Sequence, residues 1–286
     1  MNFKLFHSIK RMFNNHVNNE EIKESQKTEL DFLKRVLTDT IYNELIRQTF
    51  FKNVNLIAKS QMISTLEKPV DEKRLTGKIW PEKAHTMIGL KRLNNIQFCV
   101  EEVIKNDIKG DMIETGVWRG GAVIFMRMLL KHYNIKDKIV YVADSFEGLP
   151  KPDYVKYPKD ADDKHHTFDF LRVNLEEVQN NFKAYGLLDN QVKFLKGWFK
   201  DTTKNPPFKQ LSILRLDGDM YSSTWEVLEN LYNKLAVGGY LIVDDYGAIF
   251  NCREAVNDFR VQYGIKELIK KIDWTGIYWK KESIVN

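Results

Sequence analysis

The sequence has few of the features that mark secreted, zinc-binding or membrane-spanning proteins. Only two cysteines, Cys99 and Cys252, occur in 286 residues, which excludes a disulfide framework and a zinc knuckle. No run of 18 apolar residues is present, so no membrane-spanning helix is predicted. The first ten residues are partly basic but lack the apolar stretch and cleavage site of a signal peptide. These absences predict a cytoplasmic protein whose two cysteines are small buried side chains.

The chain also lacks a strong excess of charge of either sign. Lys and Arg number 44 and Asp and Glu 39, so the formal net charge is only +5. Such a mild excess, spread along the chain, does not indicate a nucleic-acid partner. Apolar residues make up 43% of the sequence, which is enough for a substantial core. The 39 acids become informative only where the fold brings several of them together.

The N-terminal third is expected to be helical. Residues 1–28 form a basic and polar arm, whose second half is predicted to be a linker. The apolar residues of the first half have helical spacing. They could rest on an anionic membrane surface, although packing on a neighbouring subunit, or poor order, is the favoured alternative. Helical periodicity marks 29–50, so residues 29–84 are predicted to be a helical lid or oligomerisation region.

The remaining residues, 85–286, are predicted to form one α/β domain. After a helix over 86–106, short apolar runs alternate with helical stretches. Five strands, each followed by a helix, predict a doubly wound parallel sheet, and two final segments joined by a short Gly-containing turn predict an antiparallel hairpin at its edge. The expected strands are 111–114, 139–143, 192–195, 211–216 and 240–243, and the expected hairpin joins 265–272 to 277–280.

Acidic residues end four of the five predicted strands. In an open α/β sheet the ligand binds beyond the carboxyl ends of the strands. The first two strands end at Glu114, before Gly116, and at Asp144. The glycines that follow do not match the dinucleotide fingerprint, and no P-loop or nucleophile elbow is present. Carboxylates at these positions suit the amino group and ribose hydroxyls of a ligand such as S-adenosylmethionine (SAM), although a tight turn without a ligand would also use these glycines.

A second acidic group lies at the ends of the fourth and fifth strands. Asp217 and Asp219 follow one strand, and Asp244 and Asp245 follow the next. Adjacent strands lie about 4.8 Å apart, so these carboxylates would repel one another unless something neutralised them. A divalent cation is the simplest remedy, and a set of oxygen ligands favours Mg²⁺, Mn²⁺ or Ca²⁺ over zinc. The alternative is that these aspartates are only helix caps and turn formers.

A bound cation would make a hydroxyl group a better methyl acceptor, because it lowers the hydroxyl pKa and fixes the oxygen in place. A neighbouring group must then accept the proton. Asp217 and Asp219 are candidates, and so are His165 and His166 in the long loop 151–167 after the second strand. That loop is expected to overhang the site and contact the substrate.

Seven stretches of the sequence, in order between residues 30 and 280, form a specific set. They are Ala84–Leu93, Ile113–Ala122, Val142–Pro150, Phe194–Asp201, Leu214–Thr224, Ile242–Gly247 and Ile272–Trp279. Together they resemble the macrocin O-methyltransferase (TylF-type) family. The resemblance implies a Rossmann-like class I methyltransferase sheet, SAM- and Mg²⁺-dependent methylation of a sugar hydroxyl, and a homo-oligomer, dimeric or larger, in which the N-terminal helical region covers the active site.

The resemblance also implies residue roles. Asp217, Asp244 and Asp245 would be the metal ligands, and SAM would lie against three turns: Glu114, Thr115 and Gly116; Asp144 and Ser145; Gly197 and Trp198. The substrate does not follow from the resemblance, and a glycosylated natural product and a surface-polysaccharide precursor both remain open. Two other functions are weighed beside it. A methyltransferase acting on a catechol-like diol would use the same metal chelation, and a non-catalytic SAM-fold binding protein would be expected to have lost some of these residues.

Overall fold

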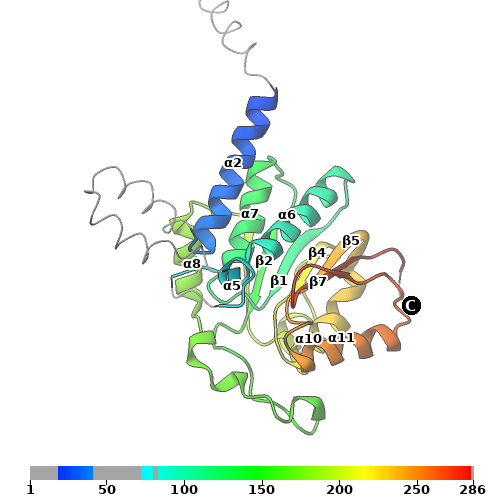
Figure 1. Cartoon of the computed structure of the whole chain (residues 1–286). Coiled ribbons are helices and arrows are strands. Elements are labelled where there is room, and N and C mark those ends of the chain that lie inside the picture. Colours follow the sequence, from blue (N-terminus) through cyan, green and yellow to red (C-terminus); the bar gives the residue numbers. More distant parts are fainter. Residues whose placement is uncertain (1–18, 41–71, 80–82, 285–286) are drawn as a thin grey trace, which may run out of the picture.

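The computed structural model describes residues 19–40, 72–79 and 83–284, and its centre is one seven-stranded sheet (Figure 1). The strand order is β3-β2-β1-β4-β5-β7-β6. Neighbours among the first five strands are parallel, whereas β7 is antiparallel to both β5 and β6. The strands are β1 Asp111–Thr115, β2 Val140–Asp144, β3 Val192–Lys196, β4 Leu211–Leu216, β5 Leu235–Val243, β6 Lys270–Lys271 and β7 Ile277–Lys280. The predicted α/β class, the parallel sheet and the antiparallel edge hairpin are therefore confirmed.

Alternating side chains of the strands build one core on each face of the sheet. Met112 and Val142 face a core completed by α2, α6 and α7, whereas Ile113 and Tyr141 face a core completed by α10 and α11. These helices lie on opposite sides of the sheet in Figure 1. β1 and β2 are therefore buried on both faces, which explains the apolar run in the sequence of each. The helices are α2 Asn19–Leu37, α5 Glu72–Leu75, α6 Leu90–Lys105, α7 Gly121–His132, α8 Leu175–Ala184, α9 Phe199–Thr202, α10 Tyr221–Leu231 and α11 Phe250–Gln262.

The helical N-terminal region begins earlier than predicted. The linker assigned to the second half of the arm is wrong from residue 19 onward, because α2 starts at Asn19 and runs without a break to Leu37. Its apolar residues Leu30, Leu33 and Leu37 are buried in the same core as α6 and α7, and this packing holds the helix on the domain. The predicted helix over 29–50 extends beyond the described residues after residue 40, and the apolar part of the arm, 3–13, also lies outside them.

Other element bounds differ from the expectations by a few residues. The helix expected from residue 86 starts at Leu90, and the strand expected from residue 240 starts at Leu235. Residues 169–171 form a short 3₁₀ turn, so the helix expected from residue 170 begins only at Leu175. Both cysteines are buried, as expected. Within the ranges that the structure describes, no helix is long and apolar enough to cross a membrane.

Candidate active site

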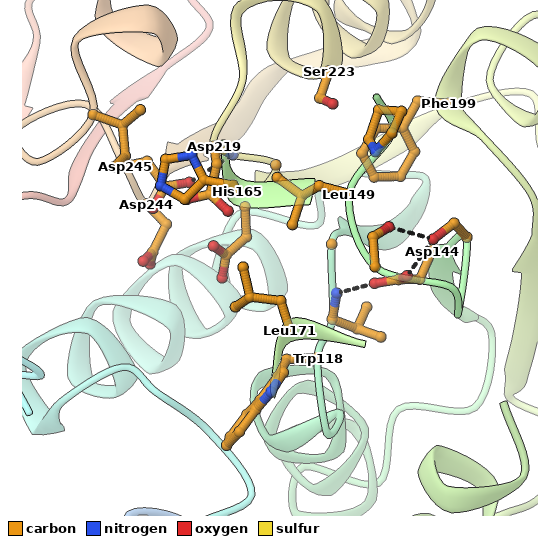
Figure 2. A pocket seen from close by; sticks show the side chains of 18 of the residues that line it. Trp118, Asp144, Leu149, His165, Leu171, Phe199, Asp219, Ser223, Asp244 and Asp245 are labelled. Carbon is orange, nitrogen blue, oxygen red and sulfur yellow. Dashed lines mark hydrogen bonds between the residues drawn. The ribbon is translucent and has the colours of Figure 1, made fainter. Parts of the chain in front are cut away.

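A cavity of about 620 Å³ opens at the carboxyl ends of the parallel strands. Figure 2 shows its two ends: Asp219, His165, Asp244 and Asp245 gather at one, whereas Asp144 and Phe199 lie at the other. We call these the β4–β5 end and the β1–β2 end. Of the predicted site residues, the lining includes Glu114, Gly116, Asp144, Ser145, His165, Gly197, Trp198, Asp217, Asp219, Asp244 and Asp245. It does not include Thr115, whose hydroxyl donates to the carbonyl of Arg215, or His166.

Glu114, the residue before the last of β1, is a buried carboxyl group in the lining of the cavity. Its Oε1 pairs with Arg215, but its Oε2 is buried and has no hydrogen-bond partner. Burial is the main reason why the pKa of Glu114 is raised to about 8, with the nearby guanidinium opposing it. An unsatisfied buried carboxyl oxygen is costly for the protein alone. It is the arrangement expected where a ligand supplies a hydrogen-bond donor, such as an amino or hydroxyl group.

Asp144 at the end of β2 organises the turns on both sides of the cavity. Its Oδ2 accepts the backbone N–H of Val117 at 2.8 Å, and its Oδ1 accepts that of Phe146 at 2.7 Å. Burial raises its pKa, and these hydrogen bonds oppose the rise. Ser145 donates to the carbonyl of Gly148 at 2.7 Å and so closes the second turn. Ser145 Oγ also lies 3.4 Å from Oδ1 of Asp144, and the backbone N–H of Trp118 contributes as well. A ligand hydroxyl would therefore use the lone-pair positions of Asp144 that these donors leave open.

Gly116 has a role that the sequence did not reveal. Its φ of +88° favours glycine, and a Cβ here would lie 1.7 Å from the carbonyl oxygen of Asp217. Because it has no side chain, Gly116 lets the end of β1 lie against Asp217, the residue that follows β4. Beside this close approach, Glu114 and Asp217 pair with the same guanidinium group, that of Arg215.

The predicted metal ligands converge at the β4–β5 end. One carboxylate oxygen from each of Asp217, Asp244 and Asp245 lies within 4.8 Å of the others. Asp219, in the left-handed region at φ 57°, donates its backbone N–H to Asp245 at 3.2 Å. Burial and then the neighbouring carboxylates raise the pKa of Asp217 to about 6 and of Asp219 to about 7, and they raise the pKa of Asp245 further. Crowded oxygen ligands of this kind fit Mg²⁺.

Two buried arginines neutralise part of this acidic group, a contribution that the prediction from the sequence, with a divalent cation as the simplest remedy, did not include. Arg215 on β4 is fully buried and pairs with Glu114, Asp217 and Asp244. Arg92 on α6 pairs with Asp244 and with Asp273 of the β6–β7 turn. Six carboxyl groups thus meet two guanidinium groups, since Asp219 and Asp245 also belong to the cluster. No Lys or Arg among the described residues pairs with Asp245, so its carboxyl group has no cationic partner there at the predicted metal position.

The arginines are the site residues that the sequence interpretation missed. Arg215 stands inside a strand whose other residues are mostly apolar, Leu211–Leu216. A charged residue in such a strand must find buried partners, and this was the available signal. Arg92 gave no comparable signal, because an arginine on an amphipathic helix usually faces solvent.

The carboxylate of Asp163 holds the imidazole ring of His165 in the cavity. Asp163, whose side chain is 2% exposed, accepts the backbone N–H of His165 at 2.8 Å and lies 2.9 Å from its Nδ1. The hydrogen bond to Asp163, ahead of the charge of Asp219, raises the pKa of His165. The pair fixes the imidazole ring and leaves its Nε2 as the second titratable nitrogen.

Comparison with known proteins agrees with this geometry. Residues 26–281 match the family model of macrocin O-methyltransferase (TylF). The 8-demethyl-8-(2,3-dimethoxy-alpha-L-rhamnosyl)-tetracenomycin-C 4'-O-methyltransferase of Streptomyces olivaceus is 47% identical over 252 residues, covering 88% of this chain and 91% of that protein. The mycinamicin III 3''-O-methyltransferase of Micromonospora griseorubida is 45% identical, covering 89% and 96%.

Solved structures extend the comparison to the fold. The O-methyltransferase NovP superposes with a TM-score of 0.79 at 43% identity, covering 90% of this chain and all of that one. The calicheamicin methyltransferase CalS11 shares the fold alone, with a TM-score of 0.54 at 14% identity over 93% of this chain and 94% of that one. The chain therefore belongs to the macrocin O-methyltransferase (TylF) family and is a SAM-dependent O-methyltransferase.

Proposed function

We propose that this enzyme transfers the methyl group of SAM to a hydroxyl group of a sugar, with Mg²⁺ bound at the β4–β5 end of the cavity. The observation that carries the proposal is the convergence of Asp217, Asp244 and Asp245 in the same cavity as the unsatisfied Glu114. The relatives support the acceptor class, since their names describe methylation of a rhamnosyl tetracenomycin and of mycinamicin III.

The β1–β2 end is proposed to bind SAM. Glu114 Oε2 would accept from the amino group of the cofactor, and Asp144 would accept from its ribose hydroxyls. Gly197 and Trp198 complete this end of the cavity after β3. Both carboxyl groups suit a ligand that carries donors and a positive charge.

The β4–β5 end is proposed to bind the metal and the acceptor. When bound, Mg²⁺ would lower the pKa of a coordinated hydroxyl group and stabilise the alkoxide. Asp217, Asp244 and Asp245 are the ligands in this proposal, and Arg92 and Arg215 hold Asp244 from both of its oxygens. The two ends share one cavity, which allows the acceptor oxygen to be aligned with the methyl group.

The proton of the acceptor hydroxyl must pass to a group of the enzyme. Asp217, Asp219 and His165 line the cavity and are the proposed candidates. His165 has the better-defined orientation because Asp163 fixes its ring. His166, the other histidine predicted from the sequence, does not line the cavity, so we place it behind these three.

The alternatives are less well supported. A catechol-like acceptor favours a flat apolar slot, whereas the β4–β5 end is lined by several charged groups. A non-catalytic binding protein does not need the intact acidic cluster.

We also propose a homo-oligomer, a cytoplasmic location and the absence of a nucleic-acid partner, together with the division into an arm, a helical lid and a catalytic domain. The membrane contact considered for the apolar part of the arm concerns residues outside the described ranges.

The test is a screen of glycosylated acceptors with methyl-labelled SAM. Mycinamicin III, which the Micromonospora griseorubida relative is named for, would be assayed beside nucleotide sugars, a surface-polysaccharide precursor and simple catechols. We expect Mg²⁺-dependent label transfer to a sugar hydroxyl, located by mass spectrometry. Transfer to the catechols alone, or full transfer in excess EDTA, would contradict the proposal.

A further inference from the structure

Asp160 is a buried carboxyl group outside the acidic cluster, and the proposed reaction does not use it. It lies at the end of a 3₁₀ turn, Pro158–Asp160, and is 0% exposed. Its Oδ1 accepts the backbone N–H of Tyr221, and its Oδ2 accepts that of Ser222, both at 2.8 Å. Asn251 on α11 adds a weaker contact to Oδ1 at 3.4 Å. These partners are 61 residues or more away in the sequence.

The contacts place Asp160 at the amino end of α10. The residue before this helix is Met220, whose side chain makes no capping hydrogen bond. A helix leaves its first N–H groups unpaired and favours negative charge beside them. Asp160 satisfies two of these groups from a distant segment and so does the work of a local N-cap residue. The amino end of α10 comes two residues after Asp219, which lines the cavity. The contact between Asp160 and α10 therefore lies next to the β4–β5 end.

The segment that Asp160 ties down forms part of the cavity wall. We call residues 151–171 the overhanging segment; in Figure 1 it is the green loop with short helical turns that extends away from the sheet. Its residues in the lining are Lys151, Asp153, Lys156, Tyr157, His165 and Leu171.

Other contacts between this segment and the helices are more exposed. Tyr157 donates its hydroxyl to Glu226 at 3.1 Å, and Lys159 pairs with Glu254 and Asp258 on α11. The Lys159 side chain is 41% exposed, and exposed ion pairs stabilise little. Among the described residues that join the segment to α10 and α11, Asp160 is 0% exposed, and its hydrogen bond with Ser222 is buried.

We propose that Asp160 is a positioning residue that fixes the overhanging segment by capping α10 from outside the helix. The wall that carries Tyr157 and His165 is then formed before the acceptor binds, and it does not have to close over the acceptor afterwards. The part of this proposal that concerns the acceptor rests on the proposed function. The attachment of the overhanging segment to α10 through Asp160 does not.

The test compares Asp160→Asn with Asp169→Asn, a matched change in the same segment. An asparagine keeps the shape but offers one accepting oxygen, and its NH₂ group would face a backbone N–H. Asp169 is an exposed control, with a side chain that is 92% exposed and does not line the cavity. Limited trypsin digestion followed by mass spectrometry would measure cleavage after Lys156, Lys159 and Lys164.

For Asp160→Asn we expect cleavage in this segment to become about tenfold faster, the change expected for loss of a helix cap. The affinity for S-adenosylhomocysteine, measured by calorimetry, should stay within about twofold. Asp169→Asn should change neither. With an acceptor from the screen, Asp160→Asn should raise the acceptor KM while kcat stays nearly constant.

Three results would overturn the proposal. One is cleavage in the segment no faster than in Asp169→Asn. The second is a uniform rise in cleavage along the chain together with lost S-adenosylhomocysteine binding, because Asp160 would then act only on the stability of the fold. If Asp160→Asn does not fold, hydrogen exchange of the wild-type chain decides, and rapid exchange of the Tyr221 and Ser222 amides is the third. The digestion needs no acceptor, so a failed acceptor screen leaves it informative.

Discussion

The two ends of the sheet treat buried charge in opposite ways. At the amino ends of the strands, two buried cationic side chains have partners that they share with no other cation. Lys138, before β2, donates to the carbonyls of Ile108 and Gly110, and Arg127 pairs with Asp189, before β3. At the carboxyl ends, Arg215 alone is shared by three carboxyl groups, and Asp245 has no cationic partner in the described residues.

This difference between the two ends indicates which end of the sheet is arranged for binding a ligand and not for stability alone. A fold without a ligand gains nothing from carboxyl groups that repel one another, and proteins pay for such conflicts mainly at functional sites. At the amino end, Lys138 and Arg127 each have partners of their own, although Arg127 Nη1 has none among the described residues. The excess of acid at the carboxyl end fits the binding of SAM and Mg²⁺ that we propose there.

The largest expected effect comes from the metal. Asp245→Asn removes a proposed ligand without touching either arginine, and excess EDTA removes the metal itself. Each should lower methyl transfer about a thousandfold, because several kcal/mol of charge stabilisation would be lost. Transfer of labelled methyl groups measures the loss, and S-adenosylhomocysteine binding should persist in calorimetry.

The control is the return of activity in the wild-type protein when Mg²⁺ is added back after EDTA. Activity that is unchanged in Asp245→Asn and in EDTA would contradict the proposed metal site, and the acidic carboxyl end would then need another explanation.

The next effect concerns the arginines at the two ends. Arg215→Met should lower the free energy of unfolding by about 3–5 kcal/mol, because it leaves buried carboxyl groups without their cation. Arg127→Met at the amino end should cost about 1 kcal/mol or less, since the Asp189 side chain is 38% exposed and can return to water. Urea unfolding of both variants measures the difference. Equal losses of unfolding free energy in the two variants would show that pairing with three carboxyl groups does not make Arg215 more important for stability than Arg127.

A smaller effect should separate the two ends of the cavity. Asp144→Asn removes a charge from the β1–β2 end only, and we expect S-adenosylhomocysteine affinity to fall about tenfold, the change for one weakened hydrogen bond to a charged group. Mg²⁺ binding, measured by calorimetry, should be unchanged. Asp245→Asn should give the reverse pattern. Loss of both ligands in either variant would mean that the two ends are not independent.

How far the sequence predicts this molecule also differs between regions. The strands and their acidic ends follow from apolar runs that stop at Glu114, Asp144, Asp217 and Asp244, because buried parallel strands need such runs. The neutralisation of these acids does not follow. It depends on which side chains the close approach at Gly116 brings together, and that contact is between residues about 100 positions apart.

Asp160 illustrates the same limit in a loop. An aspartate in a polar segment predicts a turn or a surface position, and nothing local indicates a helix 61 residues later. His165 was predicted as a candidate, but its partner Asp163 was not, since both look like ordinary loop residues. Local patterns therefore predict elements and strand ends, whereas long-range hydrogen bonds decide how the site is held.

The smallest prediction concerns the pH dependence of the amino end. The hydrogen bond from Arg127 lowers the pKa of Asp189 in the folded protein. A carboxyl group with a lowered folded pKa stabilises the fold above its unfolded pKa of about 3.9, and this stabilisation is lost as the pH falls through the folded value. The free energy of unfolding of the wild type should exceed that of Asp189→Asn by less than about 1 kcal/mol at pH 7, and the gap should shrink at about pH 3. A gap that persists unchanged at the lower pH would mean that the pair acts through shape and not through charge, and the amino end would then no longer serve as the example of satisfied charge.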